Sequence, residues 1–325
     1  MGVVMRVMDY KAAVETPAYD FLRKNKDLNG IAYLVASGSH GYGTNTKASD
    51  LDLRGFLIED ERYLYGLHKF EQFEEKETDT VIFGAQKFIK LCAQGNPNML
   101  ELLGVEDEEI VVCSKIGRMV RNHADLFLTK RVEQTFGNYA NAQLKRLQNA
   151  LVRNEASEAI QEQHILETLQ RQIGHFDKKY AKLEEGGLEL RIENGQIVMD
   201  ASLRGYPLRD FAGIYGEMQG TIRTYNKLGR TPHLKDSPRL YKHAMHLVRM
   251  LVTGRDILEG KGIITKRRAE NGLLMMIRNE ELSFEEIFEK VSVLQEEFEQ
   301  AAKESELPEQ VDMDKVEELL ISLYK

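Results

Sequence analysis

The sequence predicts an N-terminal α/β (α+β) domain with a small mixed sheet, followed by a mostly α-helical domain. Short apolar runs with strand character, separated by glycine-rich turns and helical segments, occupy the first 128 residues. From Arg131 onward, long segments have helical periodicity and few helix-breaking residues. We therefore expect two domains, 1–128 and 129–325.

The first domain opens with a predicted helix at Tyr10–Lys24, which ends near Asn29-Gly30. The elements expected after it are strands at Ile31–Ala36 and Leu51–Ile58, a turn region at Asp60–Leu67, a third strand that ends with Asp79–Phe83, a helix at Gly84–Gln94, a short helix capped by Asn98 that runs through Leu103, and a fourth strand at Glu109–Cys113.

The second domain is predicted to contain one β-hairpin among its helices. Asn194-Gly195 is the strongest short signal for a hairpin, and it lies between apolar runs at Leu188–Ile192 and Ile197–Met199. The expected helices are Val132–Asn154, Ser157–Lys182, Leu208–Leu228, Leu240–Leu258, Phe284–Lys303 and Lys315–Tyr324.

The composition fits a soluble globular protein, with 325 residues of which 42% are hydrophobic and 30% are charged. No apolar run is long enough to span a membrane, and Met1–Met8 lacks the pattern of a signal peptide, so we expect a cytoplasmic location without membrane partners. Two cysteines, Cys92 and Cys113, make neither a disulfide framework nor a zinc site.

Charge is distributed unevenly along the chain, whose net charge of −8 argues against tight nonspecific nucleic-acid binding by the whole protein. Arg223–Arg268, the basic stretch, holds twelve Lys or Arg against three acidic residues, a local charge of +9. Glu280–Glu318 holds fifteen acidic residues against three Lys, a local charge of −12. The asymmetry favours one face for an anionic partner, although surface helices of uneven charge would produce the same count.

The main motif is Gly38–Arg54, which reads GSHGYGTNTKASDLDLR and follows an apolar strand. Its glycines allow close backbone approach to a ligand, and successive backbone N–H groups can bind an anion. Asp50 and Asp52 are two positions apart on a predicted strand, so they share one face. Hard cations such as Mg²⁺ bind through one or two carboxylates plus substrate phosphates, which indicates metal-assisted phosphoryl chemistry.

Either half of this motif is weak alone, because most glycine-rich turns are only turns and Asp-x-Asp often marks a solvated strand face. Together, Gly38, Ser39, Asp50 and Asp52 resemble the signature of the DNA polymerase beta-like nucleotidyltransferase superfamily. The resemblance implies that Gly38 and Ser39 hold nucleotide phosphates. It also implies that Asp50 and Asp52 hold Mg²⁺, or Mn²⁺ in its place.

A third carboxylate is expected from a neighbouring strand. Glu75, Glu77 and Asp79 recur at period two, and the alternative is a solvated edge strand that carries acids. Asp79 directly precedes the apolar run that anchors the strand, and the resemblance points to it as well. Its role would be to accept the proton of an attacking hydroxyl or to complete the metal site.

A second signature contains Lys87-Phe88 and Gly95-Asn96-Pro97-Asn98, followed by an apolar helix. With the aspartates, it resembles the bacterial and phage branch of the superfamily that is associated with RNA repair and RNA ligases. The likeness continues in segments that cover most of the chain, namely Phe136–Leu144, Lys242–Arg249 and Ile277-Arg278-Asn279.

Lys242, His246 and Arg249 lie on one face of a predicted helix and could bind a triphosphate. Helix histidines beside ordinary surface charges are the alternative. The adjacent cations Lys266, Arg267 and Arg268 are expected to contact an RNA backbone. His40 is expected to make a local hydrogen bond or a base contact, and Arg54 shares the face of the aspartates and could pair with them.

These patterns favour a Mg²⁺-dependent nucleotidyltransferase that uses a nucleoside triphosphate, and the resemblance implies that the acceptor is an RNA end. Two alternatives stay open: transfer to a protein side chain, as in nucleotidylating toxin–antitoxin systems, and a non-catalytic RNA-binding module. The sequence does not reveal the preferred nucleotide, whether a template is used, or the oligomeric state.

Overall fold

The computed structural model describes residues 9–155, 165–170, 187–193, 196–202, 207–229 and 237–325. The chain divides into two compact units: Met1–Leu144 with Tyr241–Lys325 form the first, and Lys145–Leu240 form the second. The first unit therefore joins the N-terminal α/β region to the last helices of the chain. The boundary expected at residue 128, as the end of the first predicted domain, stays a prediction.

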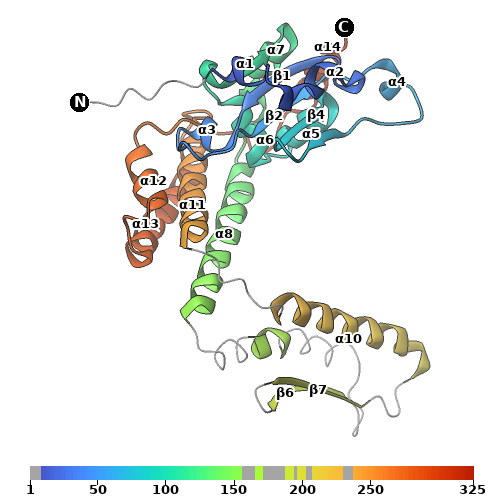
Figure 1. Ribbon diagram of the computed structural model, residues 1–325, viewed down its shortest axis with the longest axis vertical. Helices are drawn as coiled ribbons and strands as arrows, with labels where there is room; N and C mark the ends of the chain where they lie inside the picture. Colours follow the sequence, from blue (N-terminus) through green and yellow to red (C-terminus); the bar gives the residue numbers. More distant parts are fainter. Residues whose placement is uncertain (1–8, 156–164, 171–186, 194–195, 203–206, 230–236) are drawn as a thin grey trace. The chain divides into compact units, whose positions relative to one another are not determined.

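A five-stranded sheet forms the centre of the first unit (Figure 1). Its strand order is β3-β4-β2-β1-β5. Only β2 and β4 pair in parallel, so the sheet is mixed, as the sequence predicted. The strands are β1 (Ile31–Ala36), β2 (Leu53–Leu57), β3 (Gln72–Glu75), β4 (Thr80–Gly84) and β5 (Ile110–Cys113).

The helix predicted at Tyr10–Lys24 is wrong as a single element. The chain instead forms α1 (Tyr10–Ala13), a 3₁₀ turn at Pro17–Tyr19, and α2 (Phe21–Lys24). Pro17 explains the break, because proline lacks the N–H that a continuing helix needs and disfavours helical geometry in the residue before it.

Two other local predictions need correction. The segment before Phe83 forms two strands, β3 and β4, because the chain reverses direction between Glu75 and Thr80. Asn96, and not Asn98, caps α6 (Pro97–Leu103), since the Asn96 side chain accepts hydrogen bonds from the next turn. Pro97 stands at the first helical position, where a missing N–H costs nothing.

Apart from α10, which is described below, the other helices confirm the predicted α/β-then-helical order. They are α3 (Gly38–Tyr42), α4 (Glu61–Leu64), α5 (Ala85–Ala93), α7 (Lys115–Asn122), α8 (Arg131–Glu155), α11 (Ser237–Leu258), α12 (Asn271–Arg278), α13 (Phe284–Glu304) and α14 (Met313–Ser322). Four of them, α3, α4, α7 and α12, were not predicted from the sequence, and turns were expected in place of α3 and α4.

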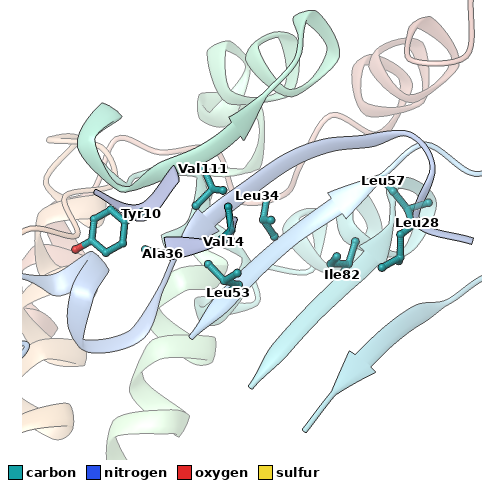
Figure 2. Packing of buried hydrophobic residues seen from close by; sticks show 9 residues of the cluster. All are labelled: Tyr10, Val14, Leu28, Leu34, Ala36, Leu53, Leu57, Ile82 and Val111. Carbon is teal, nitrogen blue, oxygen red and sulfur yellow. The ribbon is translucent and has the colours of Figure 1, made fainter. Parts of the chain in front are cut away.

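A buried cluster ties the N-terminal segment to the sheet (Figure 2). Tyr10 and Val14 pack with Leu34 and Ala36 of β1 and with Leu53 of β2. Burying large apolar side chains stabilises such a layer by about 1.5–3 kcal/mol each. The packing therefore holds the end of β1 and the start of β2, the two points at which the candidate site is attached.

The second unit contains the predicted hairpin, formed by β6 (Gly187–Glu193) and β7 (Gln196–Ser202). It also contains α10 (Leu208–Gly229), and residues 165–170 are helical. Leu166, Leu169, Leu190 and Ile214 form its buried core. The Asn194-Gly195 turn and most of the helix expected at Ser157–Lys182 lie outside the described residues. None of the described helices is both long and apolar enough to cross a membrane.

Candidate active site

Gly38 begins the short helix α3, directly after β1. Its φ of 60° lies in the left-handed region, which favours glycine. A Cβ at Gly38 would lie 2.2 Å from Oδ2 of Asp52, far inside contact distance. Glycine is therefore required at this position, because the carboxylate of Asp52 lies directly against the turn.

Asp52 lies just before β2 and not within it, which corrects the expected strand at Leu51–Ile58. The pairing of β1 with β2 ends at Ala36 and Leu53, since β1 turns into α3 at that point. The backbone N–H of Ser37 donates to the Asp52 carbonyl over 2.8 Å and the Ser37 hydroxyl donates to it over 3.1 Å. Asp50 is exposed.

The parallel register of β2 and β4 places Asp79 beside Asp52. Leu53 pairs with Thr80, and the two aspartates are the residues immediately before this pair. Burial and a hydrogen bond to the Asp79 carboxylate raise the pKa of Asp52 to about 6. The two carboxyl groups are therefore close enough to share a proton.

Arg54 pairs with Asp79, with 2.7 Å between Nη2 and Oδ1. Burial alone would raise the pKa of Asp79, but the hydrogen bond and charge of Arg54 lower it below the ordinary value. Asp79 is consequently the ionised member of the pair and Asp52 is the better proton acceptor. Asp79 has a φ of 41°, so a non-glycine residue adopts left-handed backbone at this position.

The period-two pattern of Glu75, Glu77 and Asp79 does not correspond to one strand face. Glu75 ends β3, and the chain turns before Asp79. The backbone N–H of Glu77 donates to the Glu75 carboxylate over 3.3 Å, within this turn. Of the three acids, Asp79 is the one that lies beside Asp52.

Tyr19 is a neighbour of both aspartates that the sequence reasoning missed. Burial raises the pKa of its phenol, and the charges of Asp52 and then Asp50 raise it further. Both carboxylates therefore lie near one half-buried hydroxyl group. Pro17, two residues earlier, was the available signal that the chain turns toward the site here.

The donor set of the site suits a hard cation. Among the residues that the structure describes, no three His, Cys, Asp or Glu side chains are grouped to hold a metal ion. Two adjacent carboxylates are nevertheless sufficient for Mg²⁺, which completes its shell with water and substrate phosphates. Asp52 and Asp79 fit this requirement, because a cation between them would offset the repulsion of two adjacent carboxylates.

The helix α11 contributes Lys242 and His246 to the same neighbourhood. Lys242 is exposed, has no ion pair with the described residues, and its charge lowers the pKa of both Asp52 and Asp79. Burial, followed by the charges of Arg249 and Lys242, lowers the pKa of His246 to about 3. His246 is therefore neutral at physiological pH and offers one N–H donor.

Arg249 is buried and paired, and the contact with a triphosphate expected for it stays a prediction. Its guanidinium is 4% exposed and ion-paired with Glu101, which is also buried. It stacks over the Tyr42 ring at 3.6 Å, and the Tyr42 hydroxyl donates to Glu101 over 2.9 Å. This buried triad connects α3 with α6 and α11, so Arg249 supports the turn.

The three cations expected to contact RNA have acidic partners. Lys266 lies 2.8 Å from Glu109, and buried Arg267 is ion-paired with Asp256. Arg268 alone is well exposed, although it lies 2.7 Å from Glu106. Of the three, only Arg268 presents most of its side chain to solvent.

His40 makes a local hydrogen bond, one of the two roles expected for it. Its ring is buried, and Nδ1 lies 3.1 Å from the Tyr10 hydroxyl. Burial is the main reason that the pKa of His40 is lowered. The ring therefore anchors the Gly-Ser turn to the N-terminal segment.

A Gly-Ser turn beside paired carboxylates is the arrangement that the resemblance to the polymerase beta-like nucleotidyltransferases led us to expect. The family model RlaP, described as the RNA repair pathway DNA polymerase beta family, matches residues 18–182, just over half of the chain. The chain belongs to this family, which implies a nucleotidyltransferase connected with RNA repair. Searches among curated proteins and among solved structures gave no match.

Proposed function

We propose that the protein is a Mg²⁺-dependent nucleotidyltransferase that transfers a nucleoside monophosphate from a nucleoside triphosphate to a hydroxyl group at an RNA end. The observation that carries the proposal is the Asp52–Asp79 pair against the Gly38 turn. The membership of the chain in an RNA-repair family supports RNA as the acceptor.

In this reaction the acceptor oxygen attacks the α-phosphorus and forms a new P–O bond. The bond from that phosphorus to the α,β-bridging oxygen breaks, and pyrophosphate leaves. The hydroxyl proton passes to a carboxylate of the site and then to water.

Asp50, Asp52 and Asp79 would hold Mg²⁺ or Mn²⁺. A bound cation of this kind stabilises the negative charge on the phosphate oxygens. Ser39 and the turn amides would orient the triphosphate, together with Lys242 and the neutral His246 of α11. Arg54 keeps Asp79 ionised and fixes its position beside Asp52.

The test is incubation of the purified protein with each labelled triphosphate, Mg²⁺ or Mn²⁺, and RNA acceptors, followed by separate RNA and protein gels. We expect label on RNA, its loss in Asp52→Asn, and its retention in Glu74→Gln, a change at an exposed acid of β3. Label on protein alone would favour the protein-nucleotidylating alternative. Wild-type protein that labels neither would contradict the proposal.

A further inference from the structure

Arg278, the last residue of α12, contacts the loop that connects the catalytic turn to Asp50. It donates one hydrogen bond to the Thr44 carbonyl and another, of 3.1 Å, to the Ser49 hydroxyl. Arginine has five N–H donors, so most of the donors of this guanidinium are left for other partners.

Arg278 differs from the other shielded arginines in having no acidic partner among the described residues. Arg249 pairs with Glu101, Arg255 with Asp256, and Arg267 with the same aspartate. Burial lowers the pKa of the half-buried Arg278 guanidinium, and no neighbouring carboxylate offsets it. A shielded cation without a counter-charge is unfavourable, and a bound anion would remove that penalty.

Lys242 and Arg278 face a shared neighbourhood from different helices. Both charges act on the ring of His246, and Lys242 also acts on Asp52 and Asp79. Two cations without ion pairs to the described residues therefore act on one neutral imidazole, and Arg278 contacts the loop directly before Asp50. Unpaired cations close to carboxylates that can hold Mg²⁺ fit a ligand that carries several phosphates.

We propose that Arg278, together with Lys242, binds the triphosphate of the nucleotide. The inference rests on the proposed nucleotidyl transfer for the identity of the ligand. Because Arg278 also holds Thr44 and Ser49, triphosphate binding and the position of the loop before Asp50 are coupled through one side chain.

The test compares binding of a non-hydrolysable nucleoside triphosphate and of the corresponding monophosphate, in Mg²⁺, by calorimetry. Arg278→Gln should weaken triphosphate binding by at least about tenfold and leave monophosphate binding within about twofold. Lys242→Gln, at an exposed position that folding tolerates, should act in the same direction. The matched control is Arg118→Gln, a change at an exposed arginine of α7.

Equal weakening of both ligands would show that Arg278 only supports the loop, and unchanged triphosphate binding in either variant would also overturn the inference. If Arg278→Gln does not fold, Arg278→Lys, which has fewer donors, takes its place in the same comparison. The two proposals fail separately. Arg278-dependent binding without transfer to any acceptor contradicts the proposed function, whereas transfer with Arg278-independent binding contradicts this inference.

Discussion

The candidate catalytic corner, Gly38 with Asp52 and Asp79, and the basic stretch, Arg223–Arg268, differ in how their charges are balanced. In the corner, two carboxyl groups lie together and Arg54 is their one paired cation among the described residues. In the basic stretch, most described cations are paired with acids. Arg249, Lys266 and Arg268 take theirs from α6 and the segment after it.

The difference teaches that a count of charges along the chain does not predict the field around the folded molecule. The basic stretch loses much of its +9 to acids that are distant in sequence. The corner contains few residues, but it holds two carboxyl groups and one paired cation. This happens because the parallel pairing of β2 and β4 brings the starts of these two strands together. Unbalanced charge therefore marks the candidate site more reliably than abundant charge.

The largest expected effect is in the corner. Asp52→Asn should lower nucleotide transfer on the order of 10⁴-fold, as is typical when a catalytic carboxylate is removed. Its thermal unfolding temperature should not fall, since the variant removes a charge that the fold does not neutralise. Single-turnover transfer and thermal melts measure the two quantities, and transfer at the wild-type rate would remove Asp52 from the site.

The next effect is in the basic stretch, on stability. Arg249→Met leaves the buried Glu101 without its partner and should lower the free energy of unfolding by about 3–5 kcal/mol. The double variant Arg249→Met/Glu101→Leu should recover much of this loss. Urea unfolding measures both; a single variant as stable as wild type would show that the pair is not structural.

A smaller effect, on the pH dependence of stability, should come from His246, which stays neutral because it is buried among cations. Because the folded pKa of His246 is about 3, the unfolded chain binds a proton below pH 6.5 that the folded chain does not. Stability is therefore lost on acidification, by about 2 kcal/mol between pH 6.5 and pH 5. Urea unfolding of wild type and His246→Gln should show this difference, and parallel pH profiles would contradict it.

The smallest effect concerns Arg268. Arg268→Gln should leave stability within about 0.5 kcal/mol, as for an exposed pair. If Arg268 contacts RNA, the slope of log affinity against log salt should fall by roughly 0.7 for a single strand. Fluorescence anisotropy at several salt concentrations measures the slope, and an unchanged slope would place RNA on another surface.

The parts of the fold and of the candidate site that could be predicted from the sequence involve residues that are close together in the chain. Gly38 and Asp52 are close in the chain, and the strand before them is strongly apolar, so the turn and its acid follow from local pattern. Asp79 could be favoured over Glu77 because it stands next to an apolar strand. The reversal of the chain after Glu75 could not be predicted, since polar residues fill both the strand and the turn.

The partners of buried charges could not be predicted. Arg249 and Glu101 each stand in an apolar helix, which signals that a partner exists, but 148 positions separate them. Lys266 and Glu109 are separated by 157 positions. Long-range pairing depends on how helices pack around the sheet, and helical periodicity defines a face without identifying its neighbour.

The late position of α12 in the sequence has a consequence during synthesis of the protein. Asn271 donates to the Gly43 carbonyl and Arg278 to that of Thr44, across 228 and 234 positions of the chain. The ribosome completes the Gly-Ser turn and the aspartates early, and Arg278 emerges only after the whole second unit. A growing chain therefore carries the Gly-Ser turn and the aspartates for most of its synthesis without the contacts that Asn271 and Arg278 make with their loop. A polypeptide whose synthesis stops before residue 271 contains the turn and the aspartates but lacks these contacts.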